Sequence, residues 1–158
     1  MTNTIDIKAS ADGAAGILSN LYPHSFQIDG VVCGGMEGFI QSLKYPDPIE
    51  QMAVASLSGH KARNFGRLGL NWMVKQELYW KGKPYARGSR QYKNLIRRAY
   101  QACFDQNPLF RETLFHTGLD TLVHYMGNSD QTKTPLTEAE FMFELYRLRS
   151  IVQQEGIA

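Results

Sequence analysis

A long amphipathic helix is the feature of this sequence that most constrains the fold. From Ser89 to Cys103, apolar side chains recur at the spacing of one helix face, while the basic residues lie largely off that face. The apolar positions are Tyr92, Leu95, Ile96, Ala99, Tyr100 and Cys103. The rest of the chain must therefore supply a core on one side of this helix.

Shorter helices and one small β element are expected around it. An Asp-Gly pair separates two β-prone runs within residues 25–33, which predicts a tight hairpin. A helix should begin after Gly35 and end near Tyr45, because two prolines follow. Further helices are expected at residues 58–66, through the segment containing Trp72 and Trp80, at 107–118 and from Thr137 onward, with a short strand at 122–125.

These elements predict a single compact domain over residues 1–158, mostly α with a small β element and thus of the α+β class. A net charge of +2 and 43% apolar residues favour neither disorder nor a strongly basic nucleic-acid-binding protein. The N-terminus shows no targeting signal, and no run reaches the roughly 20 apolar residues of a membrane span. A cytoplasmic location without membrane association is therefore expected.

The cysteines and histidines favour neither a metal site nor a disulfide. Cys33 and Cys103 are far apart in sequence, and the four histidines show no ligand spacing. Phosphate-binding glycine loops and nucleophile elbows are also missing from the sequence. We expect no cofactor and no metal, so a site would have to use carboxylate, amide, amine and guanidinium groups.

A polar stripe occupies the helix that is expected after Gly35. Glu37, Gln41 and Lys44 share one face of that helix beside an apolar face. The stripe is either a solvated edge or a site. Taken alone, a glutamate in a first turn and a lysine in a last turn are more often simple partners of the helix dipole.

Two further clusters of residues have both a structural and a functional interpretation. The basic run of the long helix could bind phosphate or nucleic acid, but a solvated helix face is the commoner reason for such a pattern. It comprises Arg87, Arg90, Lys93, Arg97 and Arg98. Trp72 and Trp80 could stack on a base, although aromatic residues at helical spacing mostly pack in a core.

Several segments, in order, resemble the NADAR family of N-glycosidases. Residues 18–23, LSNLYP, are similar to the opening motif of the family, and residues 26–30 to the hairpin that follows it. The most specific match is the pattern E-x-x-x-Q-x-x-K-[FY], which falls on Glu37, Gln41, Lys44 and Tyr45. The likeness continues through Ala62 to Arg67, Asn71-Trp72, Phe104 to Pro108, Thr117, Leu122, Val123, Leu145, Leu148 and Arg149, and so covers about residues 17–149.

The resemblance implies an enzyme that cleaves a base or amine from a ribose carbon. Glu37 would stabilise the cationic ribosyl transition state or move a proton. Lys44 would attack the ribose carbon to form an imine, or instead hold a phosphate. Gln41 would orient ribose hydroxyls. The other implied substrate contacts are Asn20 and Tyr22 at the pocket mouth, Arg67 on a phosphate, and Asp130 on the ribose or base. Trp72, as a stacking wall suggested by the aromatic pattern, is a further candidate contact.

This chain departs from the family pattern at three places. Gly38 stands where the family usually has histidine, the segment of residues 79–90 is longer than is usual in the family, and residues 127–141 differ from its late loop, which is expected to shape the pocket. The implied substrates are an ADP-ribose conjugate such as ADP-ribosylated guanine in nucleic acid, or a ribosylated nucleotide intermediate of riboflavin synthesis. The alternative is a non-catalytic module that binds ADP-ribose or NAD.

Overall fold

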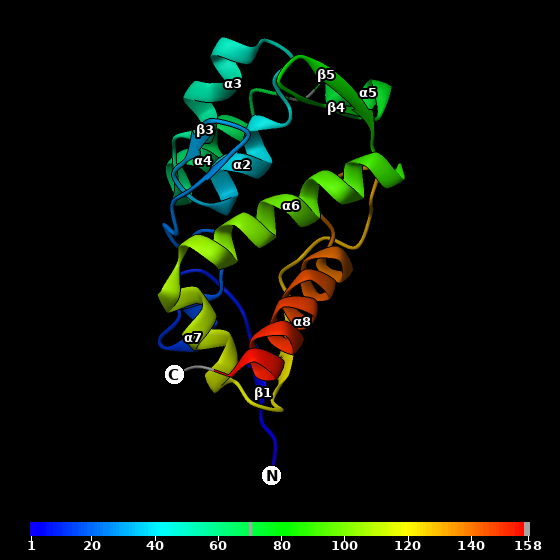
Figure 1. The fold of residues 1–158 in the computed structure, drawn as a ribbon. Coiled ribbons are helices and arrows are strands. Elements are labelled where there is room, and N and C mark those ends of the chain that lie inside the picture. Colours follow the sequence, from blue (N-terminus) through cyan, green and yellow to red (C-terminus); the bar gives the residue numbers. More distant parts are fainter. Residues whose placement is uncertain (70, 157–158) are drawn as a thin grey trace.

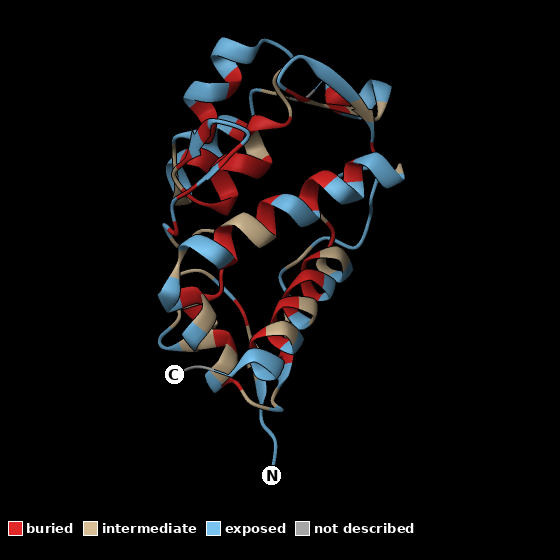
Figure 2. Cartoon of the chain, viewed as in Figure 1, coloured by how far each residue is buried: buried red, intermediate tan, exposed pale blue. Residues whose placement is uncertain are grey.

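The long helix runs through the middle of the computed structural model, which describes residues 1–69 and 71–156 (Figure 1). This helix, α6 (Arg90–Gln106), begins where Ser89 Oγ accepts a hydrogen bond from the Tyr92 amide at 3.1 Å. All six predicted apolar positions are buried, and Phe104 extends the stripe. Figure 2 shows this stripe as buried patches along one side of α6, so the prediction is confirmed.

The remaining elements are short, apart from the last helix. The other helices are α1 (Ala14–Ile17), α2 (Met36–Ser42), α3 (Pro48–Ala55), α4 (Gly59–Gly66), α5 (Trp72–Lys75), α7 (Pro108–His116) and α8 (Glu138–Glu155). The strands are β1 (Thr4–Asp6), β2 (Phe26–Ile28), β3 (Val31–Cys33), β4 (Glu77–Trp80), β5 (Lys83–Ala86) and β6 (Thr121–Val123). They form three two-stranded sheets. The fold is thus α+β and mostly helical, as expected.

Helix α6 lies between two groups of elements. In Figure 1, α2, α3, α4 and the hairpins β2–β3 and β4–β5 lie on one side of it, and α7, α8 and β1 lie on the other. Buried side chains of both groups, such as Phe39 and Leu145, belong to one hydrophobic cluster with those of α6. The chain therefore forms one compact domain around this helix.

The predicted hairpin at residues 25–33 is confirmed as β2–β3. Asp29 and Gly30 both have positive φ, 51° and 78°, the geometry that a two-residue hairpin turn requires. Gln106 of α6 fixes β2 at both main-chain polar groups of Gln27. Its Oε1 accepts from the Gln27 amide at 2.8 Å, and its Nε2 donates to the Gln27 carbonyl at 2.9 Å.

The segment containing the two tryptophans was predicted incorrectly. The helix there is only the single turn α5, and residues 77–86 form the antiparallel hairpin β4–β5 instead. Lys81 and Gly82 form its turn, with φ values of 52° and 83°. The Tyr79 amide donates to the Leu43 carbonyl at 2.8 Å, which ties this hairpin to the end of α2.

Strand β1 was not expected. It pairs in parallel with β6, so that Thr4 lies opposite Thr121, 117 residues further along the chain. The helix predicted to reach Tyr45 ends at Ser42 as α2. The predicted capping box is present at the start of α8, where Thr137 Oγ1 accepts from the Glu140 amide at 3.1 Å. Among the described residues, none of the helices combines the length and the apolarity that crossing a membrane requires.

Candidate active site

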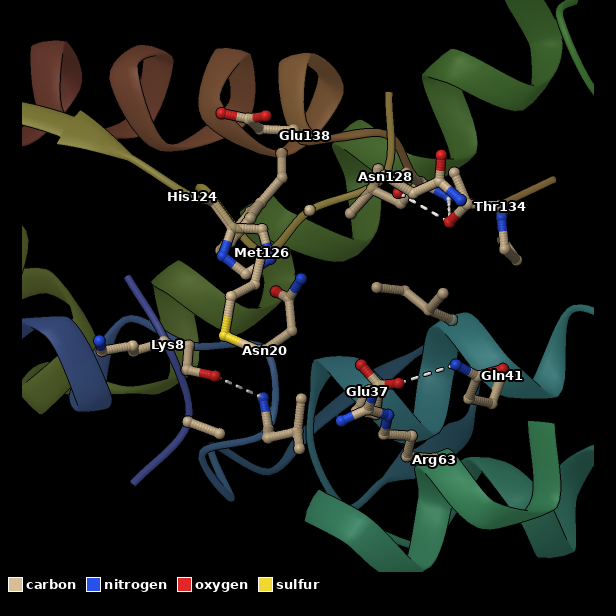
Figure 3. Close-up of a pocket in the computed structure, with 18 of the residues that line it drawn as sticks. Lys8, Asn20, Glu37, Gln41, Arg63, His124, Met126, Asn128, Thr134 and Glu138 are labelled. Atoms are coloured by element: carbon tan, nitrogen blue, oxygen red, sulfur yellow. Dashed lines mark hydrogen bonds between the residues drawn. The ribbon is translucent and has the colours of Figure 1, made fainter. Parts of the chain in front are cut away.

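A cleft of about 440 Å³ opens between the start of α2 and the segment that follows β6 (Figure 3). Apolar side chains such as Ile40, Leu136 and Phe141 form part of its wall. Its polar and charged lining consists of Lys8, Ser10, Ser19, Asn20, Glu37, Gln41, His60, Arg63, His124, Asn128, Thr134, Thr137 and Glu138. The cleft therefore gathers residues from both ends of the chain.

Glu37 is the buried carboxylate of this cleft. It lies in the first turn of α2, as predicted, and its side chain accepts a hydrogen bond from Gln41 Nε2 at 2.7 Å. Only 8% of Glu37 is exposed. Burial raises the pKa of its carboxyl group, while the Gln41 hydrogen bond and the positive charges of Arg63 and Lys44 act in the opposite direction.

Gln41 contacts Glu37 from one turn further along α2. Its Nε2 donates a hydrogen bond to Glu37, whereas its buried Oε1 has no hydrogen-bond partner among the described residues. A Cβ at Gly66 would come within 1.9 Å of this Oε1, so the glycine makes room for the amide against α4. The prediction that Glu37 and Gln41 share one helix face is confirmed.

Asn20 reaches the cleft from the loop after α1. Its main-chain carbonyl accepts from the Glu37 amide at 3.0 Å, which satisfies one of the free N–H groups at the start of α2. Its side-chain Oδ1 accepts from the Tyr100 hydroxyl at 2.7 Å. With Oδ1 occupied, the Nδ2 group is the donor that Asn20 can present to a ligand.

Glycines explain why α2 lies so close to the chain that follows α3. A Cβ at Gly34 would come within 2.4 Å of the Ser56 carbonyl oxygen, and one at Gly38 within 2.1 Å of the Leu57 carbonyl oxygen. These contacts are with backbone, which cannot move aside as a flexible side chain can. The departure from the family pattern at Gly38 therefore has a packing reason: position 38 has no room for a side chain.

Lys44, the third member of the predicted stripe, does not line the cleft. Its Nζ donates to the Gly66 carbonyl at 3.1 Å, and the residue is half-buried. Burial lowers the pKa of its ammonium group, and the nearby charge of Glu37 opposes that shift. The amine is thus electrostatically linked to Glu37 but directed to the backbone of α4.

Four other predicted contacts also lie outside the cleft lining. Tyr22 is half-buried and packs on His24, with 4.4 Å between ring centroids. Arg67 is exposed just after α4. Trp72 is a core residue with 2% exposure, and its indole N–H has no partner among the described residues. The structure does not bring these three side chains to Glu37.

Asp130, the fourth, lies in the exposed loop after β6. It accepts hydrogen bonds from the Thr132 amide at 2.9 Å and from the Thr132 hydroxyl at 2.7 Å. These two bonds lower the pKa of its carboxyl group. Asp130 therefore shapes its own loop, whereas Asn128, two residues earlier, lines the cleft.

Most of the basic run near α6 is paired within the protein. Arg87 is buried and binds Glu140 through both terminal nitrogens, at 2.6 and 3.1 Å. Arg98 pairs with Asp29 at 2.9 Å, and Arg97 lies 3.9 Å from Glu144. None of the run's five residues lines the cleft. The commoner interpretation, a structural and solvated helix, therefore fits most of this run.

Sequence patterns did not single out the basic groups that do line the cleft. Arg63 lies on α4, four residues before Arg67, and His124 comes directly after β6. Lys8 and His60 complete the set. The spacing of Arg63 from the G-R motif was the one available signal. Among the described residues, no cluster of three histidine, cysteine or carboxylate side chains is arranged to hold a metal ion.

Comparison with known proteins places the chain in a family. The model of a family described as bacteriophage protein GP30.3 matches residues 13–150. The chain belongs to this GP30.3 family. Enterobacteria phage T4 has a relative described as an uncharacterized 17.1 kDa protein in the Gp30-rIII intergenic region. It is 33% identical to this chain over 146 residues, which is 92% of this chain and 96% of the phage protein.

The GP30.3-family chain also shares its fold with a bacterial protein. The NMR structure of the Escherichia coli protein YbiA superposes with a TM-score of 0.65 over 98% of this chain and 88% of the YbiA chain. The two sequences are 18% identical, so the match establishes a common fold. This chain therefore has a YbiA-like α+β fold.

Proposed function

We propose that this protein is a NADAR-type N-glycosidase that hydrolyses the bond between a base or amine and a ribose carbon. The observation that carries the proposal is the buried Glu37 carboxyl, which accepts a hydrogen bond from Gln41 in a cleft that Lys8 and Arg63 also line. Burial raises the pKa of this carboxyl group, so it keeps its proton to higher pH than an exposed glutamate and can give that proton to a departing base.

The cations of the cleft suit a ribosyl nucleotide. Phosphate groups are bound by arginine and lysine side chains, and Arg63 and Lys8 line the same cleft as Glu37. In our proposal Arg63 makes the phosphate contact that the sequence assigned to Arg67. Asn20 and Gln41 then hold the ribose, since both line the cleft and both bind Glu37, Gln41 through its side-chain amide and Asn20 through its main-chain carbonyl.

Two chemical routes differ in the role of Lys44. In the imine route its amine attacks the ribose carbon, which requires the hydrogen bond from Nζ to the Gly66 carbonyl to break and the side chain to turn. In the direct route water attacks, and the charge of Lys44 stabilises the ionised form of Glu37. The observed position of Lys44 favours the direct route. Borohydride trapping of a Lys44 adduct would instead establish the imine.

Release of a base distinguishes the proposed enzyme from a module that only binds ADP-ribose. The test is to incubate the protein with ADP-ribosylated guanine DNA, NAD and a ribosylaminopyrimidine phosphate, and to follow base release by mass spectrometry. Release from one of these substrates identifies its class. Binding of ADP-ribose without release from any of the three would overturn the glycosidase proposal and leave the binding module.

A further inference from the structure

We propose that His124 is the general base that activates water in the cleft. This inference rests on the proposed function. Sequence patterns did not single out His124, but the fold places it across the cleft from Glu37. Figure 3 shows Glu37 on the α2 wall and His124 on the wall formed after β6, with Asn20 between them.

The tautomer of His124 is determined by its main-chain partner. Its Nδ1 lies 2.6 Å from the carbonyl oxygen of Ile7, directly after β1. A carbonyl oxygen only accepts hydrogen bonds, so Nδ1 must carry the proton. The neutral imidazole then has its lone pair on Nε2, the nitrogen that can accept a proton from water.

The ring is also fixed in orientation. Phe141 of α8 contacts it edge to face, with 5.3 Å between centroids and an interplanar angle of 85°. On another side, a Cβ at Gly127 would come within 2.7 Å of Cδ2 of His124, so the backbone passes close to the ring. A base with a fixed tautomer and a fixed ring needs no reorganisation before it accepts a proton.

His24 provides an internal comparison. Its Nε2 lies 2.8 Å from the Ile17 carbonyl oxygen, so it too has a main-chain partner. It is buried between the rings of Tyr22 and Phe110 and does not line the cleft. A carbonyl partner alone is thus a structural feature of histidines in this fold. The cleft position distinguishes His124.

In the proposed step Glu37 is the general acid and His124 is the general base. The oxygen of a water molecule forms a bond to the ribose carbon while its proton moves to Nε2 of His124. The carbon–nitrogen bond breaks, its electron pair stays on the base nitrogen, and that nitrogen takes the proton of Glu37. Proton exchange with solvent then restores both groups.

The pH dependence of the reaction should show the role of Glu37. Activity falls as the pH rises and Glu37 ionises, because the carboxylate then has no proton to give to the departing base. The other charged and titratable groups that face the same cleft are Lys8, His60, Arg63 and Glu138. Those groups and Glu37 are unchanged in the variants below, so the variants should keep this decrease.

The test compares His124→Asn and His124→Gln with the wild type. An asparagine amide can still donate to the Ile7 carbonyl but cannot take a proton, so His124→Asn separates the structural bond from the base. We expect kcat to fall by about 100-fold or more, the usual contribution of a general base, with KM nearly unchanged and the decrease of activity at high pH retained. His116→Asn, on the exposed end of α7, is the matched control.

The outcomes separate this inference from the proposed function. If the wild type releases base and both His124 variants keep its kcat and pH profile, His124 is not the base and the glycosidase function stands. If the wild type releases no base from any of the three substrates, both proposals fall. Thermal unfolding confirms that each variant is folded, and His124→Gln serves if His124→Asn is not.

Discussion

At the scale of single residues, Glu37 experiences opposing influences. The first turn of α2 places it at the positive end of a helix dipole, where a carboxylate is favoured, but burial disfavours the charged form. Burial dominates, and the pKa is raised. A group of this kind is suited to donating a proton, and it also makes the stability of the fold depend on pH.

Glu37 should therefore destabilise the fold as pH rises. Between its ordinary pKa and its raised pKa in the folded state, the folded protein binds more protons than the unfolded chain, so the free energy of unfolding falls with increasing pH. We expect Glu37→Gln to unfold at a higher temperature than the wild type above that window and to lose this advantage below it. Thermal unfolding of both proteins across the acidic range checks this. A difference in Tm that is independent of pH would contradict it.

At the scale of elements, local patterns predicted what local interactions build. The apolar stripe of α6 and the Asp-Gly turn of β2–β3 depend on residues that are close together in the sequence, and both were predicted. The β4–β5 hairpin was missed because its aromatic residues also fit helical spacing, and the left-handed turn at Lys81-Gly82 decides between the two. Strand β1 was missed because its partner lies more than a hundred residues away.

The candidate site was predictable to the same extent. Glu37 and Gln41 are one helical turn apart, so their contact follows from spacing. The same spacing argument failed to place Lys44 in the cleft, because the carbonyl of Gly66 on α4 binds its amine. Arg63 and His124 reach the cleft through tertiary packing, which no short motif records.

The wall of the cleft formed by residues 134–137 should depend on the buried Arg87. Its Nε donates to the Thr134 carbonyl at 2.9 Å while its terminal nitrogens bind Glu140. We expect Arg87→Met to lower the free energy of unfolding by about 3 kcal/mol, because it leaves a partly buried carboxylate unpaired. The double variant with Glu140→Gln should recover part of this loss. Urea unfolding of the single and double variants measures it, and strictly additive effects would contradict the coupling.

At the scale of the whole molecule, the cleft lies between the two groups of elements that α6 holds together. One wall comes from α2 and α4, and the other from the segments that follow β1 and β6. Of the basic run near α6, Arg87 and Arg98 form close ion pairs and Arg97 lies 3.9 Å from Glu144. Arg90 and Lys93 are exposed and form no ion pair with the described residues. The surface outside the cleft therefore offers these two cations of the run to a nucleic acid.

Binding of a modified nucleic acid should consequently depend only weakly on salt. We expect the plot of log K against log salt for an ADP-ribosylated oligonucleotide to be steeper than that for free ADP-ribose by about 2, the value for two phosphate contacts. Fluorescence anisotropy at several salt concentrations measures both slopes. An additional slope of about 5 or more would show a nucleic-acid surface that this account does not contain.

The most direct test of the central claim is base release by Glu37→Gln. The variant keeps a side chain that can contact Gln41 but cannot supply the proton. Glu112→Gln, an exposed glutamate on α7, is the matched control. We predict that the rate of base release from the substrate found for the wild type falls by about 100-fold to 10,000-fold in Glu37→Gln and is unchanged in Glu112→Gln. Wild-type release by Glu37→Gln would contradict the account.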